Sequence, residues 1–331
     1  MRIQASLNEF AEWLKAHDDY VLIGHVNPDG DSIGSTIAVC RALRALGKRA
    51  FVLLPNPVPP MYQCFPDWTE ALQADSAQPF IPQTAFALDV SEPERMGDLR
   101  SVYESCPAQA MFDHHGTNPG FGQIQRVEEH CAATGEMAVR LLDALNAPID
   151  SITALWLFVA ISTDTGHFRF PATAPSTMQA TARLLEAGID IADITQKLWY
   201  SRSLPRTRLL GAVLNELQVS ADGRISYARM THEMLERCAA SRADSEGIVN
   251  YLLEIEGVRF AALAEERENG TKFSLRARAQ ANIDVSQIAA QFGGGGHALA
   301  AGCTLNMPLD EAIDAVLAQA RIALDGVKRD E

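Results

Sequence analysis

The sequence predicts a two-domain α/β protein whose N-terminal domain is a doubly wound parallel sheet. Apolar runs near residues 21–25, 49–54, 85–90 and 109–114 alternate with helical segments, the pattern of parallel strands joined by crossover helices. The chain has 331 residues, a length typical of about two domains, and its 47% hydrophobic content can supply a core for each. Beyond about residue 218 the pattern changes to that of a smaller α/β unit.

The helices of the first domain are expected before, between and after these strands. A helix at residues 7–16 follows Ser6, a suitable N-cap, and Glu9 completes a capping box. The turn sequence Asn27-Pro28-Asp29-Gly30 leads to Asp31 and Ser32, which are expected to open a helix at residues 33–46. Further helices are predicted at residues 135–145, 151–161, 177–186 and 194–200. The proline-rich loop at residues 55–60 is interpreted as a rigid spacer.

The second domain is expected to combine a hairpin with helices. Strands are predicted at residues 225–230, 258–265 and 271–277, with a hairpin turn at residues 266–270. Helices are predicted at residues 245–254 and 285–292. The domain bounds are therefore expected at residues 1–190 and 218–331, with a helical connector at residues 191–217.

Charge and cysteine usage limit the function classes. The net charge of -14 disfavours a protein that holds long nucleic acid by counterion release, although a short nucleotide needs only a local positive pocket. The six cysteines form no Cys-x-x-Cys pair, which favours reduced thiols and a cytoplasmic protein. No apolar run approaches ~20 residues, so no membrane association is expected.

Acidic and imidazole side chains follow each of three predicted strands and one buried helix. Because the carboxyl ends of neighbouring parallel strands border one crevice, these side chains are expected to converge. Carboxylates with imidazoles suit Mn²⁺, Fe²⁺, Mg²⁺ or Zn²⁺, and a pair of ions with a bridging carboxylate is usual for phosphoryl chemistry. An aspartate at the position of Asp164 can equally cap a helix. The candidate residues are His25, Asp29, Asp31, Asp89, Asp113, His114, His115 and Asp164.

These motifs resemble those of the DHH phosphoesterase family. The segment from His25 to Ser35, the isolated Asp89, the triplet Asp113-His114-His115 and the later Thr163-Asp164-Thr165-Gly166 carry the resemblance. Near the C-terminus, Phe292 to Gly302 is similar to the glycine-rich signature of the associated DHHA1 domain. The resemblance extends from about residue 6 to about residue 325, and the subgroup most similar to the chain is the bacterial bifunctional oligoribonuclease and PAP phosphatase (nano-RNase) type.

The resemblance implies a role for each residue of the first domain, which would be the DHH catalytic domain. It implies that His115 faces the phosphate as electrostatic stabiliser or general acid and that Asp113 orients a histidine. It also implies two Mn²⁺ ions, although ligand chemistry alone does not separate Mn²⁺ from Mg²⁺ or Fe²⁺. One ion would be bound by His25 and Asp29, the other by Asp31, His114 and Asp164, and both by Asp89.

In the second domain, the DHHA1 substrate-binding domain by resemblance, four consecutive glycines precede a histidine. Such a run lets backbone N–H groups approach an anion, but it is neither a Walker loop nor a dinucleotide-binding turn. The resemblance implies that this loop contacts substrate phosphate or ribose, while Arg276 or Arg278 clamps a terminal phosphate. The family often has Arg-Ser where this chain has Arg276-Ala277, so the choice of arginine stays open, and each can equally be a solvated strand residue. The loop residues are Gly294, Gly295, Gly296 and His297.

The expected function is therefore hydrolysis of short nucleotides by two metal ions. The resemblance implies cleavage of very short oligoribonucleotides and dinucleotides to 5′-mononucleotides, and of 3′-phosphoadenosine 5′-phosphate (pAp) to AMP. The main alternative is a phosphodiesterase for the linear dinucleotides pApA or pGpG, which arise from cyclic dinucleotides. A single-strand exonuclease, a pyrophosphatase and a non-catalytic nucleotide sensor are the remaining alternatives.

Overall fold

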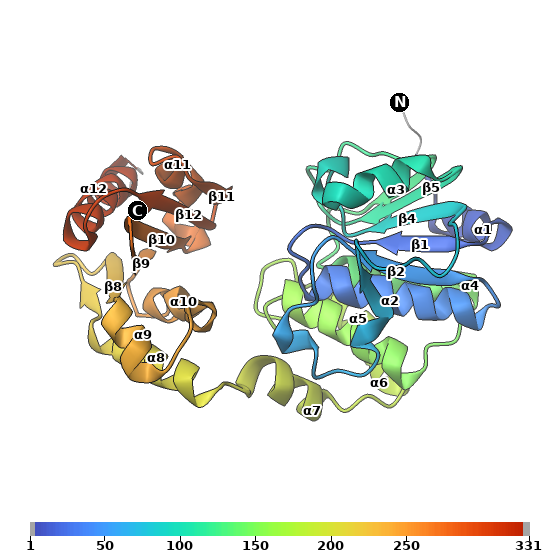
Figure 1. Cartoon of the computed structure of the whole chain (residues 1–331), viewed down its shortest axis with the longest axis horizontal. Helices are drawn as coiled ribbons and strands as arrows, with labels where there is room; N and C mark the ends of the chain where they lie inside the picture. Colours follow the sequence, from blue (N-terminus) through green and yellow to red (C-terminus); the bar gives the residue numbers. More distant parts are fainter. Residues whose placement is uncertain (1–3, 327–331) are drawn as a thin grey trace. The chain divides into compact units, whose positions relative to one another are not determined.

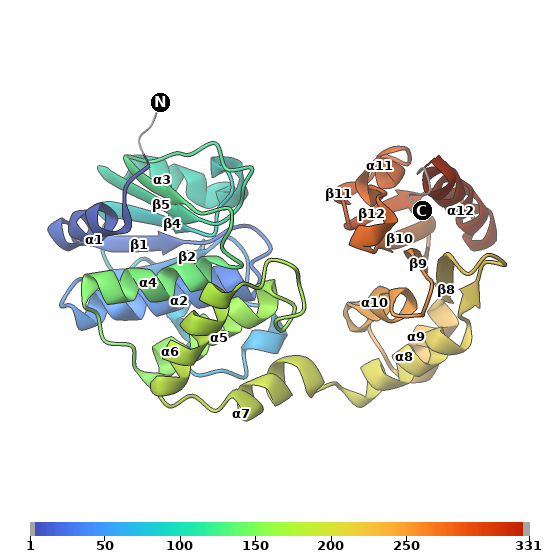
Figure 2. The ribbon, with the colours of Figure 1, turned by 180° about the vertical axis from the view of Figure 1, so that it is seen from behind.

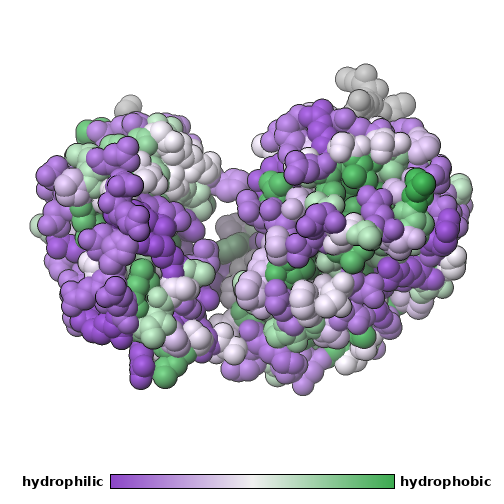
Figure 3. Space-filling view, viewed as in Figure 1, coloured by the Kyte–Doolittle hydropathy of each residue, from purple (hydrophilic) through white to green (hydrophobic). Residues whose placement is uncertain are grey.

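The computed structural model describes residues 4–326, and the chain divides into two compact units between Ser201 and Arg202 (Figure 1). The outermost residues of the two predicted domains, 1–3 and 327–331, lie outside the described part. On the face drawn in Figure 3, hydrophobic residues are scattered among hydrophilic ones on both units. None of the helices within residues 4–326 combines the length and apolar character needed to cross a bilayer.

A six-stranded sheet forms the centre of the first unit, and all its neighbouring strands are parallel. The predicted doubly wound parallel sheet is therefore confirmed. The strand order reverses its direction of growth between β1 and β4, so the carboxyl ends of these two strands border the crevice where such sheets bind ligands. The strands lie in the order β3 (Ala71–Gln73), β2 (Ala50–Leu54), β1 (Tyr20–Ile23), β4 (Thr84–Leu88), β5 (Ala108–Asp113) and β6 (Ile124–Val127).

Helices cover both faces of this sheet (Figures 1 and 2). Alternate side chains of each strand point to opposite faces, so Leu22 and Val52 join one hydrophobic core while Val21 and Phe51 join the other. The first core includes α1 (Leu7–Ala16), α2 (Gly30–Ala45), α4 (Thr134–Leu145), α5 (Ser151–Asp164) and α6 (Pro175–Glu186). The second includes the 3-10 segment η3 (Pro93–Leu99) and α3 (Arg100–Ser105).

Two helix boundaries differ from the predicted ones, and both differences affect the site. Helix α2 begins at Gly30, not at residue 33, because Asp29 is its N-cap: the Asp29 carboxylate accepts the backbone N–H groups of Asp31 at 3.1 Å and Ser32 at 3.0 Å. Asp31 therefore lies in the first turn of the helix. Helix α5 continues past residue 161 to Asp164, so that carboxylate is carried by its last turn. The predicted capping box of Ser6 and Glu9 is present.

The segment predicted as a helical connector is helical over most of its length. Helix α7 (Ile191–Thr195) and the π-helical turn η4 (Gln196–Tyr200) belong to the first unit. Helix α8 (Leu204–Asn215) belongs to the second unit, where Leu209 and Val213 enter a hydrophobic core with α9 (His232–Cys238) and α10 (Ile248–Leu253).

The second unit is built on a mixed six-stranded sheet. Its neighbouring strands are antiparallel except for the parallel pair β8–β9. Helices α8, α9 and α10 pack on one face, and α11 (Val285–Ala290) and α12 (Leu309–Gly326) pack on the other. The strand order is β11 (Gly295–His297), β12 (Ala300–Leu305), β10 (Gly270–Ala277), β9 (Phe260–Arg267), β8 (Ile225–Met230) and β7 (Gln218–Val219).

The sequence predicts the β9–β10 hairpin, strand β8 and helices α10 and α11, but not strands β7, β11 and β12 or helices α9 and α12. Strands β11 and β12 are rich in glycine and alanine, so they lack the branched side chains that indicate a strand. Strand β7 has only two residues. In the first unit, strands β3 and β6 were not predicted either, because β3 has only three residues and β6 carries two polar residues among its four. Helix α12 was also missed, although the spacing of Ile313, Val316, Leu317 and Ala320 is that of a helix with one apolar face.

Candidate metal centre

Acidic and imidazole side chains from separate chain segments meet at the carboxyl end of the parallel sheet. In each of three groups, the candidate ligand atoms lie within 4.8 Å of one another. Each ligand sits at the end of an element or in a first or last helical turn, so the fold fixes its position. The groups are His25 with Asp29 and Asp89, Asp31 with His114 and Asp164, and Asp89 with His114 and His115.

His25, two residues after β1, presents one ring nitrogen to carboxylates. Its Nε2 lies 3.6 Å from Asp29 Oδ1 and 3.4 Å from Asp89 Oδ2. Its Nδ1–H donates to the carbonyl of Val26 at 2.8 Å, so Nε2 is the ring nitrogen that faces the carboxylates. The family resemblance implies that His25 and Asp29 share an ion, and the structure brings these two residues together.

His114, directly after β5, presents one ring nitrogen to the carboxylates of the second group. Its Nε2 lies 3.1 Å from Asp164 Oδ2 and 3.8 Å from Asp31 Oδ2. Its Nδ1–H donates to the carbonyl of Cys131 at 3.1 Å, so Nε2 is again the nitrogen available to an ion.

Asp89 directly follows β4 and faces both groups. Its Oδ2 lies 3.4 Å from His25 Nε2 and its Oδ1 lies 3.7 Å from His114 Nε2. Its backbone is left-handed, with φ of 59°, and its N–H donates to the carbonyl of Phe112 at 3.0 Å. Aspartate tolerates this conformation better than most residues do.

The N-terminus of α4 holds the buried carboxylates, a contribution that no sequence motif indicates. Asp31 is fully buried and accepts the backbone N–H groups of Thr134 at 2.6 Å and Gly135 at 2.8 Å. The Thr134 hydroxyl donates to Asp89 Oδ1 at 3.1 Å. A Cβ on Gly135 would lie 2.5 Å from the Cβ of Ala160, so only glycine fits there. The positive end of the α4 dipole stabilises these anions.

The charges of this cluster need a cation. Burial and then the neighbouring carboxylates raise the pKa of Asp31 well above its usual range. Burial and the charges of neighbouring aspartates also raise the pKa of Asp164 to about 7, against the opposing effect of His114. Although burial alone would lower it, hydrogen bonds to Asp29 and Asp89 raise the pKa of His25 to about 10. Hard oxygen donors with imidazole nitrogens at this density fit divalent cations.

His115 is oriented separately from these ligands. Its Nδ1–H donates to Asp113 Oδ1 at 2.8 Å, and Asn118 Nδ2 donates to Asp113 Oδ2 at 2.6 Å. The hydrogen bond that His115 donates to Asp113, opposed by burial, is the largest effect that raises the pKa of His115 to about 9. The His115 side chain is 39% exposed, so it is accessible to a ligand while Asp113 is buried. Asp113 therefore orients His115, which lies two residues further along the chain.

Arg95, in η3, is a second residue that no sequence motif indicates. Its Nη2 lies 3.4 Å from His25 Nδ1, and its carbonyl accepts the N–H of Val26 at 2.7 Å. It is 70 residues from His25 in the chain, so only the three-dimensional structure reveals their proximity.

In the second unit, the sheet register brings Arg276 and His297 to one row. Arg276 on β10 pairs with Ala300 on β12, which pairs in turn with His297 on β11. Paired residues of antiparallel strands share a face, so Arg276 and His297 lie on the same face of the sheet. Gly296, with φ of 142°, would place a Cβ 2.6 Å from the carbonyl oxygen of Ala300, and Gly294 would place one 2.2 Å from that of Gly302. Both positions require glycine.

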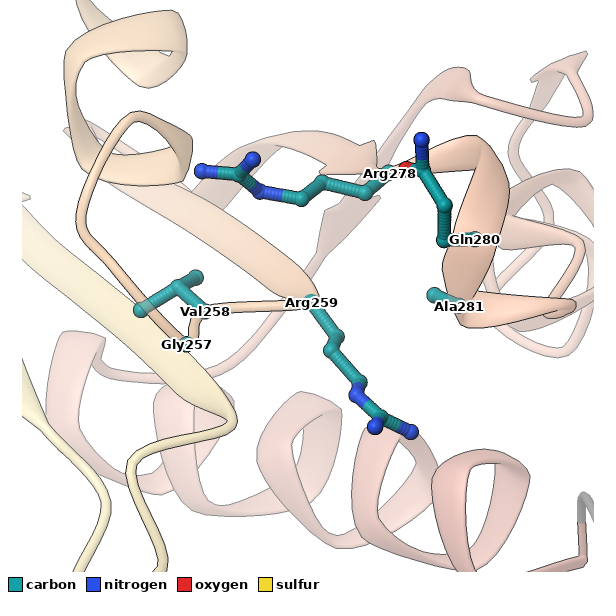
Figure 4. Close-up of a pocket in the computed structure, with 6 residues that line it drawn as sticks. All are labelled: Gly257, Val258, Arg259, Arg278, Gln280 and Ala281. Atoms are coloured by element: carbon teal, nitrogen blue, oxygen red, sulfur yellow. The ribbon is translucent and has the colours of Figure 1, made fainter. Parts of the chain in front are cut away.

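Arg278 lies elsewhere, beyond the end of β10. Its Nη2 donates to the carbonyls of Leu253 at 2.9 Å and Ile255 at 3.3 Å. In Figure 4 its guanidinium group and that of Arg259 point away from each other. The structure therefore places Arg276, and not Arg278, in the row of His297. Arg278 lines a pocket of about 260 Å³ together with Gly257, Val258, Arg259, Gln280 and Ala281.

A doubly wound parallel sheet with clustered aspartates and histidines at its switch point defines the class of the protein, which is that of metal-dependent phosphoesterases of α/β fold. Comparison with known families agrees with this class. The chain belongs to the DHH/DHHA1 phosphoesterase family: residues 19–162 match the DHH family, N-terminal domain, and residues 229–324 match the DHHA1 domain. The resemblance inferred from the motifs is confirmed.

Relatives of nearly full length support this membership. A Thermus thermophilus protein named bifunctional oligoribonuclease and PAP phosphatase NrnA is 35% identical over 317 residues, covering 94% of this chain and 92% of that protein. A Bacillus subtilis protein of the same name is 23% identical over 314 residues, covering 94% and 96%. The solved structure of an exopolyphosphatase-related protein from Bacteroides fragilis matches with a TM-score of 0.88 and 28% identity, covering 96% of this chain and 97% of that one.

Proposed function

We propose that this protein is a two-metal phosphoesterase that hydrolyses very short oligoribonucleotides and dinucleotides to 5′-mononucleotides, and pAp to AMP. The observation that carries the proposal is the meeting of four aspartates and two histidines at the switch point of the sheet. Near full-length similarity to two proteins named bifunctional oligoribonuclease and PAP phosphatase supports the substrate class.

The ligands divide between two ions, for which we propose Mn²⁺, with Mg²⁺ and Fe²⁺ suited to the same donors. When bound, such a pair of ions activates a water as nucleophile and neutralises charge on the phosphoryl oxygens. Asp89 is proposed as the bridging ligand, because its two oxygens face different histidines. The remaining ligands are proposed as His25 and Asp29 for one ion, and Asp31, His114 and Asp164 for the other.

His115 is proposed to act on the substrate phosphate. Its Nδ1–H is committed to Asp113, which leaves Nε2 as the nitrogen that carries the second proton of the imidazolium. With a pKa raised to about 9, the ring is protonated at neutral pH and can donate this hydrogen bond to a phosphoryl or leaving-group oxygen. Asn118, which holds the far oxygen of Asp113, keeps the ring in orientation.

For the second unit we propose a nucleotide-binding role for the row that contains Arg276 and His297. A guanidinium group suits a terminal phosphate, and the glycine-rich strand leaves backbone N–H groups open to an anion. The net charge of -14 favours short substrates over long strands, since long strands depend on extended positive surfaces. The linear dinucleotides pApA and pGpG are therefore the second candidate substrates.

The experiment is a substrate panel with the full chain and Mn²⁺. We expect release of AMP from pAp and of mononucleotides from pApA, pGpG and a five-residue RNA, with little product from a long single strand or from pyrophosphate. Asp89→Asn should abolish turnover, whereas His130→Asn, at a side chain that is 96% exposed, should not. Absence of turnover on all short substrates with Mn²⁺, Mg²⁺ and Fe²⁺ would show that the proposal is wrong.

Two arginine variants test the assignment in the second unit. Arg276→Ala should raise KM for pAp by roughly 10- to 100-fold, the loss of one charged hydrogen-bonding group. Arg278→Ala, which removes bonds to two backbone carbonyls outside the row of His297, should change KM little. The opposite ranking of the two variants would assign the phosphate contact to Arg278.

A further inference from the structure

We propose that Arg95 binds the substrate phosphate beside the metal centre; this inference rests on the proposed phosphoesterase function. Arg95 lies in η3 and is half-buried. Its backbone is fixed on both sides: its N–H donates to the carbonyl of Glu92 at 3.0 Å, and its carbonyl accepts the N–H of Val26 at 2.7 Å. Val26 follows the metal-binding candidate His25, so the two segments are joined directly at the site.

The contact between Arg95 and His25 cannot be a hydrogen bond. Arg95 Nη2 lies 3.4 Å from His25 Nδ1, but that ring nitrogen already donates its proton to the carbonyl of Val26 at 2.8 Å. A guanidinium group has only donors, so two donors face each other. His25 therefore does not provide the acceptor that Arg95 needs.

No other group in the described part of the chain provides that acceptor either. Within residues 4–326 no carboxylate forms an ion pair with Arg95, and the only polar contact of its side chain is the one to His25. Glu94, its neighbour, pairs instead with Arg100 at 2.6 Å. Asp29 and Asp89 face the opposite nitrogen of the His25 ring. A half-buried cation is thus kept beside a site built for divalent cations.

The side chain of Arg95 therefore lacks a hydrogen-bond acceptor that a bound anion would provide. A phosphate group supplies the missing acceptors, and the planar fork of arginine matches two of its oxygens. Arg95 approaches from the side of His25, while His115 lies 3.7 Å from Asp89 Oδ1. The side chains of Arg95 and His115 would contact different oxygens of one bound phosphate ester.

The test compares phosphate binding with metal binding. The variants are Arg95→Gln, Arg95→Lys and, as matched control, Arg100→Gln, which removes an exposed arginine paired with Glu94 and Glu104. Calorimetry measures the affinity of each full chain for Mn²⁺, and then the affinity of the Mn²⁺-saturated protein for inorganic phosphate. We expect Arg95→Gln to weaken phosphate binding by roughly 10- to 100-fold and to leave the Mn²⁺ affinity within about twofold. Arg95→Lys should recover part of the phosphate affinity, and Arg100→Gln should match the wild type.

Several results would overturn the assignment. Unchanged phosphate affinity in Arg95→Gln is one, and failure of the Mn²⁺-saturated wild type to bind phosphate is another. A variant that loses Mn²⁺ affinity but, once saturated, binds phosphate normally would make Arg95 a positioning residue for His25, which also contradicts the proposal. If the wild type binds phosphate through Arg95 but cleaves no short nucleotide, the proposed function fails while this assignment stands. Thermal unfolding of each variant verifies that it is folded.

Discussion

The clustered carboxylates should destabilise the metal-free protein, and Asp164→Asn exposes this effect. Burial and neighbouring aspartates raise the pKa of Asp164 from 3.8 to about 7. Asp164 also ends α5, where the negative end of the helix dipole disfavours a carboxylate. Asparagine keeps the shape and removes the charge, so the variant should be more stable than the wild type when no metal is bound.

The sign and size follow from proton linkage. A carboxyl whose pKa is higher in the folded state binds its proton more tightly there, so the metal-free protein loses stability as the pH rises from about 4 to about 7. The pKa of Asp164 is about three units higher in the folded state than in the unfolded state, which corresponds to a loss of about 4 kcal/mol in the free energy of unfolding at high pH. For a unit of this size, that is a rise in the unfolding midpoint of up to roughly 8–16 °C for the variant at pH 8. At pH 5, where the native carboxyl is protonated, the difference should be much smaller.

The assay is thermal unfolding in EDTA at pH 5 and pH 8, and in Mn²⁺ at pH 8. Mn²⁺ should raise the midpoint of the wild type by mass action and should raise that of Asp164→Asn much less. Asp75→Asn, at an exposed aspartate, is the control and should follow the wild type throughout. If Asp164→Asn in EDTA at pH 8 is no more stable than the wild type, the carboxylates do not repel one another as described.

Two further predictions concern groups beside the ligands. Because the hydrogen bond to Asp113 raises the pKa of His115 to about 9, turnover that needs protonated His115 should decline above about pH 9. Asp113→Asn should move this decline to lower pH, and identical pH–kcat profiles of the variant and the wild type would show that another group titrates. Gly135→Ala would place a Cβ 2.5 Å from that of Ala160, which should lower the free energy of unfolding by about 1–3 kcal/mol and weaken Mn²⁺ binding. The control Gly211→Ala, whose added Cβ has nothing within 4 Å, should be neutral or slightly stabilising. Thermal unfolding and Mn²⁺ titration measure both effects, and an unfolding midpoint of Gly135→Ala equal to that of the wild type would contradict the packing argument.

The sequence is informative wherever a residue's role depends on local geometry. Strand ends of a parallel sheet share one edge, so the strand pattern alone is enough to place Asp89 and His114 together. The same reasoning errs by a few residues at α2, because both Asp29 and Asp31 are suitable caps and only the hydrogen bonds choose Asp29. Residue-to-residue register across β10, β12 and β11 could not be predicted, since the last two strands have no recognisable pattern.

Residues that act through long-range contacts could not be found from the sequence. Thr134 and Gly135 bind Asp31 with backbone N–H groups, and a backbone contact leaves little signature in residue type. Arg95 reaches the site because a segment of the second core pairs with the loop after β1. An isolated arginine in a short 3-10 segment carries no periodic or spacing signal.

The left-handed backbone of Asp89 limits which mutations its position can accept. Glycine and asparagine adopt that conformation readily but provide no charge, whereas glutamate provides the charge at a backbone cost of about 1–2 kcal/mol and with an additional methylene. No single substitution keeps both the conformation and the carboxylate that is proposed to bridge the two ions. Among descendants of this protein, a change at residue 89 should therefore mark lineages that have abandoned the chemistry while keeping the fold.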